Sequence, residues 1–181
     1  MVGLRFDRFH DRANDYLQSA WSPKTGLVYQ LIPDQLSAFI NYQNGFRNVA
    51  PSTLSDDTRL VFSPEQANQI ETGFKFELLN GKINGTVSYY DIRVRSVFDE
   101  NNEYISVQDG TQTSKGVEFD IIANPFEGFH IIMGYGYNDS RFEKVDADME
   151  DISGRHPLAT PMNSANYWAS YKFSQGSLEG F

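Results

Sequence analysis

The segment from Gln69 to Leu78 alternates between largely apolar and largely polar residues at every position. One face would carry Ile70, Thr72, Phe74, Phe76 and Leu78, and the other Gln69, Glu71, Gly73, Lys75 and Glu77. A period of two predicts a β-strand with one apolar and one polar face. Asn80-Gly81 follows and favours a tight hairpin turn, because both residues tolerate positive φ. Ile83 to about Val97 is the expected returning strand.

The same alternation recurs along the chain and predicts about eight strands. The remaining ones are expected at Val2 to Asp7, Lys24 to Leu31, Leu36 to Phe46, Thr113 to Ala123, Phe129 to Asn138 and Ser164 to Phe173. Leu178 to Phe181 is expected to begin a ninth strand.

The connections between these strands alternate in length. Tight turns are expected around Pro33, Asn80, Asn124 and Gln175. Long polar loops are expected at His10 to Ala20, Asn48 to Ser63, Phe98 to Asp109 and Asp139 to Asn163. Outer-membrane barrels have short periplasmic turns and long extracellular loops. We therefore predict an all-β fold, an antiparallel up-and-down transmembrane β-barrel segment.

Composition agrees with this class and excludes others. Mean hydropathy is −0.48, and no apolar run reaches the roughly 18 residues that a membrane helix needs. Barrel strands alternate outward apolar with inward polar residues, so their average looks soluble. Tyrosines that close several apolar faces, such as Tyr42, Tyr89, Tyr135 and Tyr171, suit the aromatic girdles of a barrel. A net charge of −9 argues against a nucleic-acid partner.

Two other architectures share the alternating pattern. A soluble carbohydrate-binding β-domain would bury the apolar face, so that Phe74, Phe76, Ile131 and Met133 meet across a dry core. A complete, small eight-stranded outer-membrane protein with a structural or adhesive role would be a closed barrel packed with side chains. The charged face with Glu71, Lys75, Glu77, Glu118 and Asp120 favours a wide, wet lumen instead.

Catalytic and metal chemistry find little support. The chain has no cysteine, and His10 and His156 are expected in loops and His130 in a strand, without a nucleophile-elbow or zinc motif. The acidic run from Glu143 begins like a calcium loop, but Asp151 stands where the turn needs glycine and Pro157 where glutamate should be. We expect no enzyme, no cofactor and no catalytic or metal-binding residues.

Several segments resemble one family more specifically. Ser114 to Asp120 is similar to a Ser-Arg-Gly-Val-Glu-Leu-Glu strand of TonB-dependent siderophore receptors, and Gly134 to Asn138 resembles the strand that follows it. Pro64-Glu65-Gln66 with Ile70 to Lys75 resembles the step from an extracellular loop into a strand. Trp21 to Tyr29, with Tyr42 and Gly45-Phe46-Arg47, resembles the preceding hairpin. Met162 departs from the family, which often has a basic residue there.

The resemblance implies a piece of the C-terminal half of a receptor barrel in the bacterial outer membrane. Residues 1–181 would then be a partial barrel domain, without the plug domain and the last strands. The implied partners are a ferric siderophore or similar ligand, outer-membrane lipid, and TonB only through the plug. Aromatic and cationic residues at the loop ends could meet an anionic iron chelate, and the candidates are Phe46, Arg47, Tyr104 and Arg141.

Overall fold

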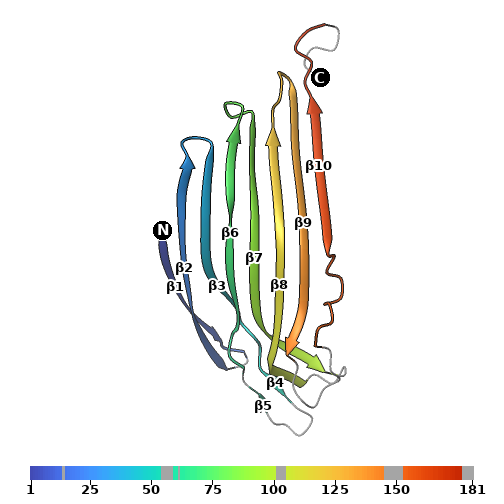
Figure 1. Ribbon diagram of the computed structural model, residues 1–181. Helices are drawn as coiled ribbons and strands as arrows, with labels where there is room; N and C mark the ends of the chain where they lie inside the picture. The colour runs from blue at the N-terminus through green and yellow to red at the C-terminus, as the bar shows by residue number, and fades with distance from the viewer. Residues whose placement is uncertain (14, 54–58, 61, 101–104, 145–152, 177–181) are drawn as a thin grey trace.

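The chain forms one curved, antiparallel sheet of eight strands in the order β1-β2-β3-β6-β7-β8-β9-β10 (Figure 1). The computed structural model describes residues 1–13, 15–53, 59–60, 62–100, 105–144 and 153–176. The strands are β1 (Val2–Asp11), β2 (Tyr16–Ile32), β3 (Leu36–Arg47), β6 (Glu65–Leu78), β7 (Ile83–Glu100), β8 (Ile105–Ala123), β9 (Phe129–Lys144) and β10 (Asn163–Tyr171). Two short strands, β4 (Ser52–Thr53) and β5 (Arg59–Leu60), pair separately.

Tight turns connect β2 to β3, β6 to β7 and β8 to β9 at one end of the sheet, the upper end in Figure 1. Asp34, Asn80, Gly81 and Gly128 have positive φ in these turns, which is why asparagine, aspartate and glycine stand there. The predicted turns at Pro33, Asn80 and Asn124 are confirmed. We call this end of the sheet the tight-turn end and the opposite end the long-loop end.

The strands are longer at the long-loop end than the sequence pattern predicts. The expected loop His10 to Ala20 is mostly strand, because β1 continues to Asp11 and β2 begins at Tyr16, so His10 is a strand residue. Likewise β7 and β8 take up most of the stretch expected as loop between residues 98 and 109, and β9 extends through Lys144. Strands that continue beyond a bilayer have water on both faces, so they need no alternation of apolar and polar residues. The expected ninth strand, Leu178 to Phe181, falls outside the described residues.

The two faces of the sheet differ in chemistry because the strand registers align equivalent positions. Phe74 pairs with Val87, Val87 with Phe119, and Phe119 with Tyr135, which places four apolar side chains in one row. The neighbouring row on the opposite face contains Lys75, Thr86, Asp120, Gly134 and Asn166. We call the first the outer face and the second the lumenal face. The predicted alternation on β6 is confirmed.

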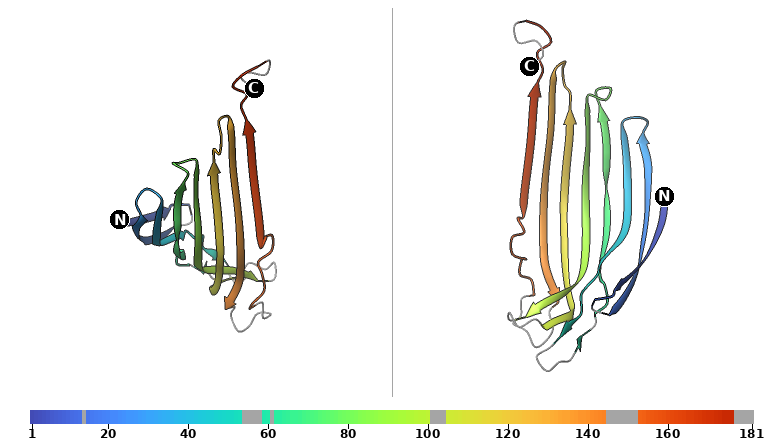
Figure 2. Two further views of the ribbon diagram at one scale, coloured as in Figure 1. Left: turned by 45° about the horizontal axis from the view of Figure 1, so that its top comes forward. Right: turned by 180° about the vertical axis from the view of Figure 1, so that it is seen from behind.

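The outer face is exposed and covered by no second layer. Phe74 is 49% and Met133 38% exposed, and Ile70 and Tyr89 are also exposed. Phe74 and Met133 lie on the same face of one sheet, so the dry core expected for a soluble domain is contradicted. Figure 2 shows the curvature, with the sheet as a single layer. Among the described residues, no helix is long and apolar enough to cross a membrane.

The two edge strands of the sheet, β1 and β10, each lack a second partner among the described strands. β1 is hydrogen-bonded along one side to β2, and β10 along one side to β9. The sheet is therefore open, and the closed eight-stranded barrel considered above is not what this chain forms.

Candidate functional site

The candidate site lies at the long-loop end of the sheet, where β2 and β3 stop pairing. The β2–β3 ladder ends at Lys24 and Gln43, whereas β1 and β2 remain paired as far as Asp11 and Tyr16. β3 instead continues beside β6 as far as Arg47. The β1–β2 hairpin therefore separates from the rest of the sheet beyond Lys24, and a wedge-shaped gap opens between β2 and β3.

A cavity of about 310 Å³ occupies the closed end of this gap. Its lining consists of Arg5, Ser22, Lys24, Gln43, Asn44, Gly45 and Phe46. The Arg5 guanidinium carbon lies 6.0 Å from the centre of the Phe46 ring, within the range of a cation–π contact. Arg5 also donates a hydrogen bond of 2.6 Å to Asp7. We call this hollow the β2–β3 cavity.

Val49 and Phe62, in the segment between β3 and β6, contact β2 farther out along the same gap. Gln18, only 4% exposed, donates hydrogen bonds of 2.7 Å to the Val49 carbonyl and 2.9 Å to the Phe62 carbonyl. Tyr16, Ala20 and Phe62 are buried as well, so much of the chain's small apolar core lies here. These contacts hold Val49 and Phe62 against β2.

Two of the predicted ligand-binding residues, Phe46 and Arg47, are neighbours at the end of β3. Phe46 lines the β2–β3 cavity. Arg47 forms a 2.9 Å ion pair with Glu65, and its side chain is 71% exposed against 14% for Glu65. The guanidinium therefore keeps most of its surface in water while one carboxylate orients it. The third candidate, Tyr104, lies outside the described residues.

The fourth candidate, Arg141, lies apart from Phe46, although the strand registers give both residues the outer-face parity. It donates a 2.8 Å hydrogen bond to Asp139, which raises the pKa of Arg141 above its usual value. Asp139 pairs in register with Lys115, and Lys115 with Asp91, which continues the outer face. Four strand-to-strand steps separate β3 from β9, or roughly 19 Å along the sheet at the usual strand spacing. Phe46 and Arg47 are consecutive residues of β3 and point to opposite faces, and Arg141 lies far from both.

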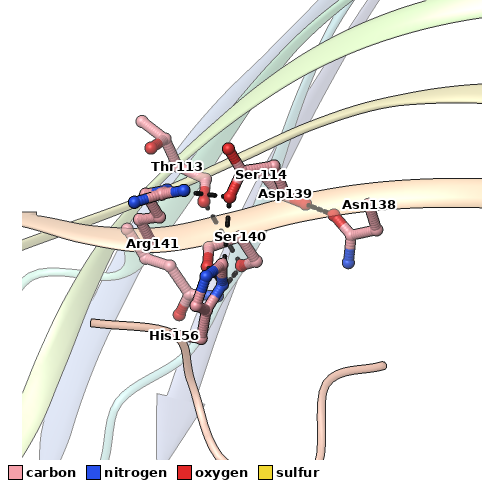
Figure 3. A network of polar contacts seen from close by, with 8 residues as sticks. Thr113, Ser114, Asn138, Asp139, Ser140, Arg141 and His156 are labelled. Atoms are coloured by element: carbon pink, nitrogen blue, oxygen red, sulfur yellow. Dashed lines mark hydrogen bonds and ion pairs between the residues drawn. The ribbon is translucent and has the colours of Figure 1, made fainter. Parts of the chain in front are cut away.

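A polar network fixes the segment after β9 to the edge of that strand (Figure 3). Ser140 is 2% exposed, and its hydroxyl donates to the Thr113 carbonyl at 3.2 Å. The His156 ring donates through Nδ1 to the Ser140 carbonyl at 2.8 Å. Main-chain bonds from Asn138 to Met162 and from Phe142 to Arg155 continue this contact. The network attaches the described part of this segment to β9.

The part of the chain that the structure describes contains no cluster of side chains suited to bind a metal ion. No group of three or more His, Asp or Glu side chains gathers there. His130 lies in β9 as predicted, and His156 lies in the segment before β10. Most of the acidic run compared with a calcium loop falls in residues 145–152, outside the described ranges.

Sequence reasoning did not select Arg5, Ser22 or Lys24, which the structure places beside Phe46. The alternation of Val2 to Asp7 puts Arg5 on the polar face, but that pattern cannot reveal which strand ends leave a gap. The missing signal is the register of β2 against β3, which depends on pairing between distant segments.

A single curved sheet with an exposed apolar outer face, a polar lumenal face and turns of alternating length defines the wall of an outer-membrane β-barrel. The family model described as TonB dependent receptor-like, beta-barrel, matches residues 1–181. The chain therefore belongs to the TonB-dependent receptor barrel family, and its place is the bacterial outer membrane.

Curated relatives and solved structures agree with this assignment. The metal-pseudopaline receptor CntO of Pseudomonas aeruginosa is 26% identical over 196 residues, covering 99% of this chain and 27% of the relative. The ferrichrome outer membrane transporter and phage receptor of Escherichia coli is 25% identical, covering 86% of this chain and 20% of the relative. BauA, the ferric preacinetobactin receptor of Acinetobacter baumannii, superposes with a TM-score of 0.76 at 25% identity, covering 97% of this chain and 27% of BauA.

The chain thus spans about a quarter of the length of these relatives. The family is therefore one of receptors and transporters.

Proposed function

We propose that this chain forms part of the wall of an active transporter that takes up ferric siderophores across the outer membrane by TonB-coupled transport. The observation that carries the proposal is the match of the receptor-barrel family to the whole of residues 1–181. Relatives named as receptors for metal-pseudopaline and ferric pyoverdine, and one named as a ferrichrome transporter, support a metal chelate as the substrate class. The protein is a transporter and not an enzyme.

The described residues supply three parts of such a transporter. The outer face, with Ile70, Phe74 and Phe119, contacts lipid. The lumenal face, with Lys75, Glu118 and Asp120, borders a polar passage. Phe46 and Arg47 lie at the long-loop end, which is the extracellular end of such a barrel, and meet the incoming chelate. Tyr104 and Arg141 remain further candidates for contact with the ligand.

Coupling to TonB requires parts other than this stretch of wall. In this proposal residues 1–181 are a partial barrel domain, and a plug domain and the last strands lie elsewhere in the protein. The plug makes the contact with TonB, and the wall described here surrounds it. No cofactor takes part, because uptake changes the location of the chelate and not its bonds.

Uptake of radioactive iron tests the proposal. A strain that relies on the protein carrying this chain is given ⁵⁵Fe chelated by pyoverdine, ferrichrome or a catecholate siderophore. We expect uptake of at least one chelate, and its loss when the proton gradient is collapsed or TonB is deleted. Uptake that survives the loss of TonB contradicts active transport, and the lack of uptake of every ferric chelate contradicts the substrate class.

A further inference from the structure

We propose that the outer face of β7, β8 and β9 carries a binding site for the phosphate groups of a lipid headgroup in the outer leaflet. The site is a patch of charged residues at the long-loop end, and its members are Asp91, Arg93, Arg95, Lys115, Asp139 and Arg141. We call it the cationic patch. The inference rests on the place of the chain in the outer membrane, and it holds whichever substrate the transporter takes up.

The patch begins where the outer face of three neighbouring strands changes from uncharged to charged residues. The last row without a charge consists of Tyr89, Val117 and Tyr137. The next row on the same face consists of Asp91, Lys115 and Asp139. Tyrosines on the outside of a barrel lie at the level of the lipid headgroups. The cationic patch therefore lies at and just beyond that level, outside the hydrocarbon core.

Two arginines of the patch lie within reach of a headgroup phosphate. Arg93 follows Tyr89 by four residues, which is about 14 Å along the strand and about 10 Å in depth at the usual tilt. Arg141 follows Tyr137 by the same four residues. Long basic side chains extend along the protein surface and keep their charged ends in the polar region. Guanidinium groups at this level can bind phosphate oxygens with two parallel hydrogen bonds.

The patch directs its positive charge outward. It holds four cations and two carboxylates, whereas the chain as a whole carries a net charge of −9. The side chains of Asp91 and Asp139 are 26% and 31% exposed, and those of Arg93 and Arg141 are 62% and 48% exposed. The carboxylates therefore lie beneath the cations and help to position them. Arg95 is exposed as well and forms no ion pair within the described part of the chain.

The concentration of charge on three strands indicates one site and not a general property of the wall. On the neighbouring strands β3 and β6, the outer face at the long-loop end is uncharged, with Asn44, Phe46, Gln66 and Asn68. If strands beyond the bilayer simply needed charge for contact with water, charged residues would be expected there too. Charge complementarity therefore favours an anionic occupant over β7, β8 and β9.

The spacing of the arginines favours a lipid with more than one phosphate. Arg93 and Arg141 lie in one row on either side of the buried Thr113, roughly 10 Å apart at the usual strand spacing. The outer leaflet of this membrane consists largely of a glycolipid whose sugar headgroup carries several phosphates. Arg141 faces outward, away from the lumen, so a lipid phosphate suits it better as a partner than a chelate in the lumen.

Binding of purified lipid A tests the inference. The probe is diphosphoryl lipid A, and monophosphoryl lipid A and phosphatidylcholine are compared with it. Native mass spectrometry of the detergent-purified protein that carries this chain measures the fraction with lipid bound. We expect Arg93→Gln combined with Arg141→Gln to weaken binding of the diphosphoryl form by about thirtyfold, since each basic residue near an anionic headgroup contributes about fivefold. Arg93→Lys combined with Arg141→Lys retains most of the binding, because the charge remains.

A charge-matched variant separates the patch from a general effect of charge. Arg12→Gln combined with Lys82→Gln removes two cations from exposed turns at the two ends of the sheet. This control should change binding by less than about twofold, because exposed charges interact over only about 10 Å in salt.

Four outcomes would overturn the inference. They are unchanged binding of diphosphoryl lipid A by the glutamine pair, an equal loss in the charge-matched control, an equal loss for all three lipids, and complete displacement of the lipid by excess inorganic phosphate. Uptake of ⁵⁵Fe is a separate readout. Its absence contradicts the proposed function and leaves lipid binding by the cationic patch unaffected.

Discussion

Gln18 and Val49 bond to each other twice, side chain to main chain. The Gln18 amide nitrogen donates to the Val49 carbonyl at 2.7 Å, and the amide oxygen accepts from the Val49 N–H at 3.2 Å. The same amide nitrogen also reaches the Phe62 carbonyl. The β2–β3 ladder stops at Lys24, and beyond it the buried Gln18 side chain on β2 supplies the hydrogen bonds to Val49 and Phe62.

Replacing Gln18 by leucine should release this segment. Leucine has a similar size but leaves the Val49 and Phe62 carbonyls without their bonds, at a cost of about 1–3 kcal/mol for each buried group that stays unpaired. We expect much faster amide hydrogen exchange at Val49 in Gln18→Leu. Gln30→Leu is the control, since Gln30 is exposed in the same strand. Unchanged protection of Val49 would contradict the role given to Gln18.

The outer face should reject charge where the lumenal face accepts it. Phe74→Arg places a cation toward the hydrocarbon core and should destabilise the folded protein by about 2–4 kcal/mol. Glu71→Arg, on the lumenal face of the same strand, should cost less than about 1 kcal/mol. Urea unfolding in lipid vesicles measures both. Equal costs for the two variants would show that the faces have been assigned wrongly.

Gly116 should tolerate no side chain, because its neighbours occupy the space. A Cβ atom there would overlap the carbonyl oxygen of Tyr137 and the ring of Tyr90. Overpacking of this kind costs about 1–3 kcal/mol, so Gly116→Ala should lower the unfolding midpoint. Gly45→Ala is a matched control in another strand, because nothing lies within 4 Å of its added Cβ.

Removing the bulk of Tyr90 as well gives a sharper version of the Gly116 test. The Tyr137 carbonyl belongs to the main chain and stays in place, so Gly116→Ala combined with Tyr90→Ala should remain less stable than Tyr90→Ala alone. Full recovery in the double variant would mean that the tyrosine ring, and not the approach of two strands, sets the requirement for glycine.

The loop before β10 should loosen when His156 is removed. His156→Ala deletes the donor to the Ser140 carbonyl and should cost about 1 kcal/mol, the usual net value of one hydrogen bond. Faster amide exchange at Phe142 and Gly154, whose main-chain bonds hold the same segment, is the expected readout. His10→Ala removes an exposed histidine from β1 and should leave these amides unchanged.

The membrane-facing part of the fold could be predicted from sequence because a bilayer imposes a regular demand. Ile70 and Phe74 must point outward and Glu71 and Lys75 inward. Apolar residues therefore recur at every second position, and the sequence alone shows this pattern. Asn80-Gly81 marked the turn for an equally local reason. The strand extensions around Tyr16 and Gln18 follow no such pattern, since what surrounds them there is water and a distant loop.

The candidate site was predictable only in part. Phe46 and Arg47 could be selected as an aromatic and a cation next to a long loop. Their separation from Arg141 depends on the order of the strands in the sheet. Arg5 and Lys24 lie beside Phe46 because the β2–β3 ladder ends at Lys24 while the β1–β2 ladder continues. These are relations between segments far apart in the sequence, which no single stretch encodes.

The free sides of β1 and β10 govern how this sheet can be handled in the laboratory. Each presents a row of main-chain donors and acceptors that has no partner among the described strands, and such rows tend to pair with another strand. When residues 1–181 are produced alone in water, we expect the edge strands of different copies to pair and the protein to aggregate. We expect the sheet to stay monomeric only when β1 and β10 are each paired with a further strand of a barrel.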